Sequence, residues 1–383
     1  MSLRCAFIGS ATLDVVLRVP AFPKEDDDAR CAPPERRLGG NAANSAVAFC
    51  EVASLLCGAG AAGIDMAVPP PPPPPCLLLA ATTDAAADAD GRFVAEALAR
   101  RGVSPGGLVV VAPSGLPVSH IILSTATGSR TIMHHRSMRE LSREEMVARL
   151  GGLGGSGCGG GGGGGGDGDG GGGGGGGGGT WLHFESRSPA VVEAMLELRA
   201  AARTAGTPSP VLSVEIEKPK HAFSLDAPFD AFFVSRAFAT AVLGADGPES
   251  AIAAVRRRVP AGALIVVPWG ERGAWASAPG AGESWVCFPG HAPLSGPVVD
   301  TIGAGDTFIG AVLAYAALEP AAAALARGEC VARTEGVLRA WLGFACCVAG
   351  EKCSQHGITI GASGAESVRA AFRARWAEAA AAT

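Results

Sequence analysis

Residues Val298–Gly310 read VVDTIGAGDTFIG, and an apolar stretch with a helical pattern follows them. Gly303 and Gly305 have no side chains, so successive backbone N–H groups of a turn can converge on an anion there. The helix that follows adds the positive end of its dipole. Asp306 would repel a phosphate there, but it can accept the proton of a hydroxyl that attacks phosphorus. A glycine C-cap followed by an aspartate N-cap explains GAGD alone equally well. The preceding Asp300-Thr301 and the helix favour a phosphoryl-transfer site with its own base.

The composition is that of a large globular protein. The chain has 383 residues, 48% of them hydrophobic, and a formal net charge of −5, which we interpret as a single domain over residues 1–383. The longest basic run, Arg256–Arg258, is typical of a solvated helix face, so no nucleic-acid partner is expected. No apolar run reaches the roughly 18 residues of a transmembrane helix, so no membrane partner is expected either.

The cysteines indicate a reducing compartment. There are 11 of them, an odd number with no C-x-x-C pair, which favours reduced thiols over a disulfide framework and argues against zinc. After Met1 the chain passes directly into a strand-like segment, without the charged and apolar regions of a signal peptide. We therefore expect a cytoplasmic protein.

The remaining sequence alternates between strand and helix patterns, which predicts an α/β fold with a mostly parallel central sheet flanked by helices. Segments 13–38 and 117–136 have a more polar alternation and predict a small antiparallel β-sheet lid. Segments 58–76, with seven consecutive prolines, and 151–179, nearly all glycine, are low-complexity insertions outside the folded core. The predicted strands are Arg4–Gly9, Leu77–Ala80, Leu108–Ala112, Val118–Leu123, Arg130–His134, Trp181–Glu185, Val211–Glu217, Ala231–Val234 and Ala263–Pro268, and the predicted helices are Ala42–Leu56, Gly91–Arg101, Pro189–Ala205, Pro248–Val259, Thr307–Leu318 and Thr334–Ala349.

The only two asparagines of the chain, Asn41 and Asn44, stand three residues apart at the start of the first long helix. Residues i and i+3 share one helix face, and two amides on one face suit the hydroxyls of a polyol. The preceding Gly40 lets a ligand approach the backbone closely. An N-cap role explains Asn41 but not Asn44. Asp14, which follows the first strand, would face the same cleft, although alone it is more typical of a turn.

Three further segments each have two interpretations. Arg130, at the start of a strand, either clamps a transferring phosphate or is a turn arginine in solvent. Glu215–Glu217 ends a strand, where the active sites of open parallel sheets collect, but a solvated charge cluster explains it slightly better. Gly270 and Gly273 follow an apolar strand, and they either leave bare backbone for a nucleotide or form a plain turn.

Two of these patterns, GGNAAN at residues 39–44 and DTIGAGDTFIG at residues 300–310, resemble the two signatures of the PfkB/ribokinase family of sugar kinases. Six secondary matches, in order, are similar to the ketohexokinase branch of that family, the animal type of fructokinase. The resemblance runs from about Arg4 to Gly357 and is interrupted by the proline and glycine tracts. The six matches are Phe22–Asp26, Gly128–Ile132, Trp181–Glu185, Glu215–Pro219, Phe233–Ser235 and Val348–Cys353.

The resemblance implies a mostly parallel sheet with flanking helices and a β-sheet lid, through which members often form homodimers. It also implies ATP and Mg²⁺ and, for this branch, the conversion of fructose to fructose 1-phosphate. Asp306 is similar in position to the catalytic base of the family. The implied binding residues are Gly303, Ala304 and Gly305 for the γ-phosphate, Asp14, Gly40, Asn41, Asn44 and Asp306 for the sugar, and Arg130, Gly270, Gly273 and Cys346 for the nucleotide and its phosphates.

The chain departs from the family at two places. After the proline tract, the segment Leu77–Asp90 stands where the family usually has a glycine-marked loop. The family carries an Asn-x-x-Glu motif near its metal-phosphate site, where this chain reads Ser235-Arg236-Ala237-Phe238, so the metal ligands stay unassigned. Dependence on K⁺ occurs in the family, and the resemblance would place that ion near Asp300. Two alternatives stay open: a kinase of the family that acts on another sugar or a nucleoside, such as ribose or adenosine, and a non-catalytic sugar-binding relative.

Overall fold

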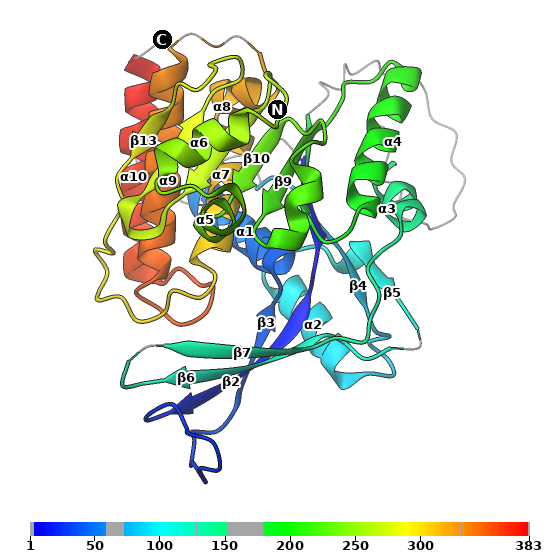
Figure 1. Ribbon diagram of the computed structural model, residues 1–383, viewed down its shortest axis with the longest axis vertical. Coiled ribbons are helices and arrows are strands. Elements are labelled where there is room, and N and C mark those ends of the chain that lie inside the picture. Colours follow the sequence, from blue (N-terminus) through cyan, green and yellow to red (C-terminus); the bar gives the residue numbers. More distant parts are fainter. Residues whose placement is uncertain are drawn as a thin grey trace.

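The computed structural model describes residues 4–58, 73–112, 114–127, 129–151, 179–329, 331 and 333–381. Within these residues the chain forms a nine-stranded sheet of order β13-β12-β11-β10-β9-β8-β1-β4-β5 and a separate four-stranded sheet of order β3-β2-β6-β7, which lies below the main body in Figure 1. The two predicted low-complexity insertions fall almost wholly outside the described residues.

The central sheet is parallel from β5 to β11, and β12 and β13 continue it in antiparallel pairing. Parallel strands that are covered on both faces consist of continuous apolar residues, and every residue of β9 and β10 is buried. This confirms the predicted mostly parallel sheet. Its strands are β1 (Arg4–Gly9), β4 (Cys76–Thr82), β5 (Leu108–Val110), β8 (Thr180–Glu185), β9 (Val211–Ile216), β10 (Ala231–Val234), β11 (Leu264–Pro268), β12 (Ala274–Ser277) and β13 (Val286–Phe288).

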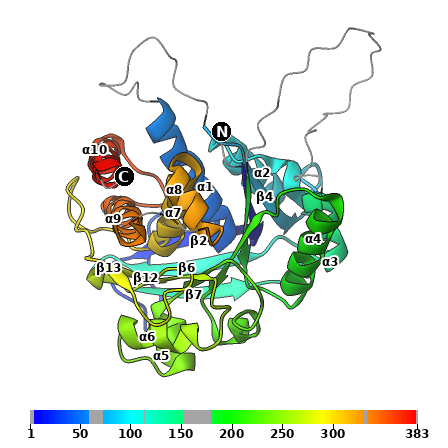
Figure 2. The same ribbon diagram turned by 90° about the horizontal axis from the view of Figure 1, so that it is seen from above.

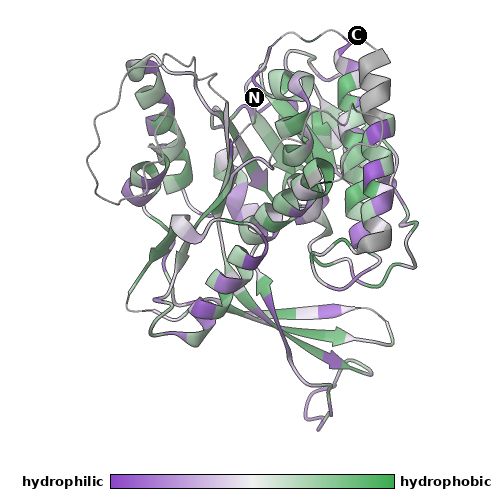
Figure 3. Ribbon diagram, turned by 180° about the vertical axis from the view of Figure 1, so that it is seen from behind, coloured by the Kyte–Doolittle hydropathy of each residue, from purple (hydrophilic) through white to green (hydrophobic). Residues whose placement is uncertain are grey.

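Helices cover both faces of this sheet (Figure 2). Two clusters of buried apolar side chains, one on each face, form the core, and the central strands are mainly hydrophobic in Figure 3. One face carries α1 (Asn41–Gly58), α7 (Ala304–Leu318), α8 (Pro320–Ala326), α9 (Thr334–Lys352) and α10 (Ala362–Ala381). The other carries α3 (Arg143–Leu150), α4 (Ala190–Ala205), α5 (Arg236–Leu243) and α6 (Pro248–Arg256), while α2 (Ala89–Arg100) contacts β2 and β3.

The second sheet corresponds to the predicted lid, but its pairing is mixed. Its strands are β2 (Thr12–Val19), β3 (Glu35–Gly39), β6 (Val118–Ser124) and β7 (Arg130–His135). β2 pairs antiparallel with β3 and β6 with β7, whereas β2 and β6 run parallel, with Asp14 opposite Ser119. The predicted lid sheet is therefore present. Its two outer strand pairs are antiparallel as expected, and its central pair, β2 with β6, is parallel. β1 and β5 are parallel and each leads into a lid strand, so β2 and β6 leave the central sheet in the same direction.

Among the described residues, no single helix is both long and apolar enough to cross a membrane. Helices α7 and α8 reach the required length only together, with a bend of 112° between them. Most of α7 is buried among the other helices of its layer, in contact with α1 and α9.

Candidate active site

A group of buried polar side chains, among them Ser10, Glu185 and Glu215, lies at the carboxyl ends of β1, β8 and β9. β1 has β8 on one side and β4 on the other, so this is the point where the strand order reverses, which is where open α/β sheets bind ligands. Ser10 follows β1, and its backbone N–H and its hydroxyl donate to Oε2 of Glu185 over 2.9 and 2.7 Å. Glu185 is the last residue of β8 and is buried. Its Oε1 accepts a hydrogen bond from Nη1 of Arg187 over 2.7 Å.

Each of the two glycines before α1 lies too close to a neighbouring residue to carry a side chain. A Cβ on Gly39 would lie 2.2 Å from Oδ1 of Asp14, and one on Gly40 would lie 2.5 Å from the carbonyl oxygen of Ser10. Gly40 also has a φ of +96°, a conformation that other residues rarely adopt. The turn from β3 into α1 therefore passes close to Asp14 and Ser10 before it reaches Asn41.

Asn41 and Asn44 lie in the first turn of α1 and reach different carboxylates. Nδ2 of Asn41 donates to Oε2 of Glu217 over 3.1 Å and to Oε2 of Glu215 over 3.4 Å. Nδ2 of Asn44 donates to Oδ2 of Asp306 over 2.8 Å, and its buried Oδ1 has no partner within the described chain. The structure thus brings the two predicted sequence signatures into direct contact through Asn44 and Asp306.

Asp306 lies in the first turn of α7, behind the glycine turn. Gly303 has a φ of +75° and precedes the helix, and Oδ1 of Asp300 accepts the N–H of Ile302 over 2.9 Å. The first turn of a helix leaves amides without intrahelical acceptors, and Gly305 and Asp306 belong to that turn. An anion beside Gly305 would therefore face amide donors and the positive end of the helix dipole. It would also lie next to the carboxyl of Asp306, a residue that is only 9% exposed.

The carboxyl groups of this site have opposite electrostatic environments. Burial raises the pKa of Asp306 to about 7, with a further rise from Glu217 and Glu185 and an opposing effect of the Asn44 hydrogen bond. Burial and the charge of Asp306 raise the pKa of Glu215 strongly. Burial also acts on Glu185, but Arg187 and the Ser10 donors outweigh it and leave a lowered pKa. Glu185 is thus an anion at neutral pH, whereas Asp306 can exchange a proton there.

Asp300 is surrounded by basic side chains that sequence reasoning missed. Nζ of Lys352, a fully buried side chain, donates to the carbonyl oxygen of Asp300 over 2.7 Å and lies 3.9 Å from its Oδ1. Arg37 and His356 approach Oδ2 at 3.3 and 3.8 Å. Burial raises the pKa of Asp300, but Lys352 and two backbone N–H groups more than compensate and lower it.

The lid contributes two of the predicted residues. Nη1 of Arg130, at the start of β7, donates to Oγ1 of Thr301 over 3.3 Å, which brings the lid to the glycine turn that precedes α7. Asp14, on β2, accepts from Thr12 over 3.1 Å, and burial raises its pKa. Arg130 is exposed but not simply solvated, and Asp14 faces the turn into α1.

Gly270, Gly273 and Cys346 lie apart from the carboxylates. A Cβ on Gly273 would lie 2.0 Å from the carbonyl oxygen of Phe288, so this glycine forms a tight turn against the segment that follows β13. The same segment, residues 288–291, touches Gly343 and Gly350 of α9, on either side of Cys346. Burial and the neighbouring Cys347 raise the pKa of Cys346 to about 12, so its thiol is a packed, neutral group.

The structure corrects one sequence interpretation and adds one residue to the site. Glu215 is not part of a solvated cluster, because it is buried under Asn41, and only Glu217 is partly exposed. Glu185 was missed altogether, since the sequence marks it only as the end of a strand. Ser235, where the family has its Asn-x-x-Glu motif, caps α5 by accepting the N–H of Phe238 over 3.1 Å. Its stretch holds no carboxylate.

Comparison with known proteins agrees with this geometry. Residues 181–360 match the sequence model of the pfkB family carbohydrate kinases. A curated relative, ketohexokinase of Mus musculus, is 28% identical over 358 residues, which cover 92% of this chain and 96% of the relative.

Solved structures of ribokinases share the fold over nearly the whole chain. Ribokinase of Arabidopsis thaliana, complexed with ribose and ATP, has a TM-score of 0.63 at 17% identity and covers 97% of this chain and 99% of its own. A ribokinase II of E. coli, in complex with ATP and Mg²⁺, has a TM-score of 0.61 at 16% identity with the same coverage.

Proposed function

Since this chain is a sugar kinase of the PfkB/ribokinase family, we propose that it transfers the γ-phosphate of ATP to a ketose. The proposed acceptor is fructose, and the proposed product is fructose 1-phosphate. The mouse ketohexokinase is the relative that favours a ketose over ribose. The observation that carries the proposal is the buried carboxyl of Asp306, held by Asn44 beside the glycine turn at the start of α7.

Asp306 acts as the general base in this proposal. With a pKa raised to about 7 by burial, it is partly ionised at neutral pH and has enough basicity to accept a proton. The proton of the sugar hydroxyl passes to a carboxylate oxygen of Asp306 as the hydroxyl oxygen forms its bond to the γ-phosphorus. The bond from that phosphorus to the bridging oxygen breaks at the same time, and ADP leaves with its electron pair.

The remaining residues bind and orient the two substrates. Asn41, Asn44 and Asp14 offer amide donors and carboxylate acceptors to the sugar hydroxyls, and Gly40 removes a side chain that would block them. The amides of the first turn of α7 and the guanidinium of Arg130 stabilise the charge that develops on the γ-phosphoryl oxygens. Closure of the lid excludes water, which would otherwise compete with the sugar as the nucleophile.

The donor set at the end of β9 fits the Mg²⁺ that accompanies ATP. Mg²⁺ prefers hard oxygen ligands and keeps several waters, so one or two carboxylates together with phosphate oxygens suffice. We assign Glu217, which is 37% exposed beside Asn41, as its protein ligand. When bound, the ion supplies positive charge that neutralises the phosphate oxygens.

We also propose that two copies of the chain associate through their lids. β7 is an edge strand of the lid, and its Ile132 and Met133 are 40% and 50% exposed. Apolar side chains on an unpaired strand edge favour pairing with another chain. Light scattering of the purified protein should give twice the chain mass, and Met133→Glu should give a single chain. A wild-type monomer at micromolar concentration would reject the dimer and leave the kinase proposal intact.

The reaction is tested by identifying the product. The full chain, ATP and Mg²⁺ are incubated with fructose, ribose or adenosine, and phosphorus NMR distinguishes a sugar 1-phosphate from other esters. Asp306→Asn should lower turnover by about 10²–10⁴-fold, while calorimetry should show unchanged ATP binding. Preferred turnover of ribose or adenosine would favour the other kinase, and fructose binding without turnover would favour a sugar-binding relative.

A further inference from the structure

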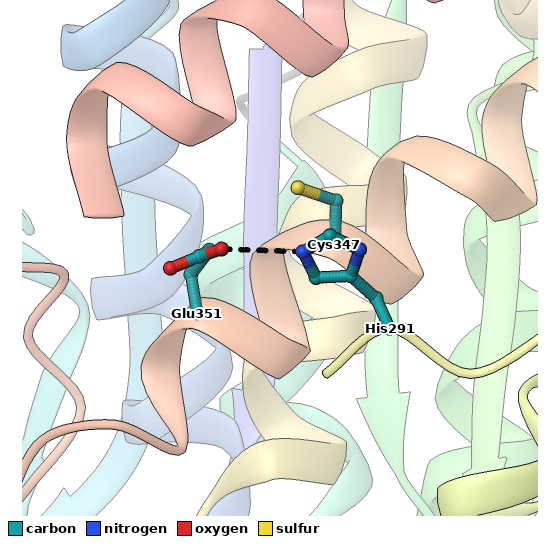
Figure 4. A group of neighbouring side chains, drawn as sticks. All are labelled: His291, Cys347 and Glu351. Atoms are coloured by element: carbon teal, nitrogen blue, oxygen red, sulfur yellow. Dashed lines mark hydrogen bonds and ion pairs between the residues drawn. The ribbon is translucent and has the colours of Figure 1, made fainter. Parts of the chain in front are cut away.

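A histidine, a cysteine and a glutamate gather on the side of α9 that faces the segment after β13. Cys347 and Glu351 are four residues apart, so they lie one turn apart on the same face of α9. His291 comes from the passing segment, and its imidazole lies next to both side chains (Figure 4). The three ligand atoms, one from each residue, all lie within 4.8 Å of one another.

We propose that this cluster, His291, Cys347 and Glu351, is a binding site for a zinc-class transition metal ion. Imidazole, thiolate and carboxylate are the three donors that zinc combines in proteins. One thiolate and one carboxylate together neutralise a divalent cation, so the metal could be held without a leftover buried charge. On binding, the thiol proton of Cys347 is released to solvent and a sulfur–metal bond forms in its place.

The distances are compatible with tetrahedral coordination. Zinc–nitrogen and zinc–oxygen bonds of about 2.0–2.2 Å place two ligand atoms about 3.3–3.5 Å apart. Nε2 of His291 lies 3.2 Å from Oε1 of Glu351, so these two atoms are already spaced as ligands of one ion. The 4.8 Å limit on the other pairs exceeds this spacing by little more than 1 Å. The side chain of His291 is 26% exposed, so its imidazole, rather than the packed helix α9, would make that adjustment.

The second ligand shell is also in place. The carboxylate of Glu351 accepts the backbone N–H groups of Leu294 and Ser295 over 2.9 and 3.2 Å. Hydrogen bonds of this kind orient a ligating carboxylate and leave its remaining electron pairs free for a metal. His291 is the exposed member of the cluster, because Cys347 and Glu351 are buried, and in this proposal water supplies the fourth ligand. The metal would tie the segment that leads to Asp300 to helix α9.

Sequence reasoning argued against zinc because the chain has no C-x-x-C pair, and the structure shows why that argument is incomplete. His291 is remote in sequence from Cys347 and Glu351, and the fold of the C-terminal half brings them together. Cys353, in contrast, lies just past the end of the same helix and donates its thiol to the carbonyl oxygen of Ala349 over 3.2 Å. It is the matched control, a partly buried thiol outside the cluster.

The experiment uses cobalt as a spectroscopic probe on the full chain, freed of metal with a chelator. Wild-type protein and Cys353→Ala should each bind one equivalent of Co²⁺, with a near-ultraviolet thiolate-to-cobalt band that added Zn²⁺ abolishes. Cys347→Ala should lose the band, and His291→Ala should weaken Co²⁺ binding at least tenfold while keeping the α9 face intact. Circular dichroism verifies that each variant is folded. The proposal is overturned if wild-type protein binds neither metal, or if Cys347→Ala keeps the band and stoichiometry.

Discussion

Nδ2 of Asn44 donates to Oδ2 of Asp306 over 2.8 Å, and this hydrogen bond joins the first turn of α1 to the first turn of α7. The two helices pack along their length, so the contact is held by the core rather than by loops. Its effect on Asp306 is electrostatic, because a donor to the ionised form lowers the pKa that burial raises. The acidity of the proposed base therefore depends on residues from two distant parts of the sequence.

Loss of the Asn44 amide should make Asp306 a weaker acid. In Asn44→Ala the pKa of Asp306 rises above its value of about 7, so at neutral pH a smaller fraction is ionised. The acidic limb of the kcat/KM profile should therefore move to higher pH. Asn41→Ala is the control, since Asn41 contacts Glu217 and not Asp306: it should weaken sugar binding and leave the limb in place. A limb at the same pH in both variants would contradict the electrostatic role of Asn44.

Removal of a neighbouring negative charge should have the opposite effect. Burial is the main cause of the raised pKa of Asp306, and Glu217 adds to it, so Glu217→Gln should shift the titration of Asp306 to lower pH. Glu217→Asp keeps the charge and should shift it less. Carbon NMR of labelled carboxyl groups, assigned with Asp306→Asn, reports this titration without relying on activity. An unshifted Asp306 signal in Glu217→Gln would show that the two carboxyls do not interact.

The sequence was informative wherever a local pattern decides the outcome. Apolar runs located the parallel strands, and the i and i+3 spacing placed Asn41 and Asn44 in one helical turn. The same patterns did not indicate how deeply a charged side chain is buried or which distant segments pair. Glu215 is buried because Asn41 packs over it, and Lys352 is buried beside Asp300, although each reads as a surface charge.

Some elements were missed because their own residues carry little signal. The helix α10 consists largely of alanine and charged residues with no clear apolar face, and its docking on α9 is a tertiary effect. The short strands β12 and β13 have only four and three residues. The parallel pairing of β2 with β6 depends on where β1 and β5 end, which is a property of the assembled sheet.

The glycine at the start of α7 should be structurally required. Gly303 has a φ of +75°, and a Cβ there would lie 2.2 Å from Cδ1 of Ile358. Gly206, at the end of α4, has a φ of +63° but open space around it. The left-handed conformation alone costs a non-glycine residue roughly 1–2 kcal/mol. Gly206→Ala should lower the free energy of unfolding by about that amount, and Gly303→Ala by more. If urea denaturation gives equal losses of unfolding free energy for the two variants, then the side chain of Ile358 moves aside without strain.

The buried ammonium of Lys352 should be a large contributor to stability. It donates to the carbonyl oxygen of Asp300 and lies beside its buried carboxylate. Lys352→Met therefore leaves that carboxylate with Arg37, His356 and two backbone N–H donors. Removing one partner of a buried ion pair typically costs about 3–5 kcal/mol. Arg339→Met removes an exposed cation from the same helix, paired with Glu335, and should cost less than about 1 kcal/mol.

A second substitution separates the charge of Asp300 from the packing of Lys352. If the loss in Lys352→Met comes from the uncompensated carboxylate, then adding Asp300→Asn should recover part of the free energy of unfolding. If it comes from lost packing of the lysine stem, the double variant should be no more stable than Lys352→Met alone. Urea denaturation of the wild type, both single variants and the double variant measures this coupling. A coupling energy near zero would show that the two side chains stabilise the fold independently.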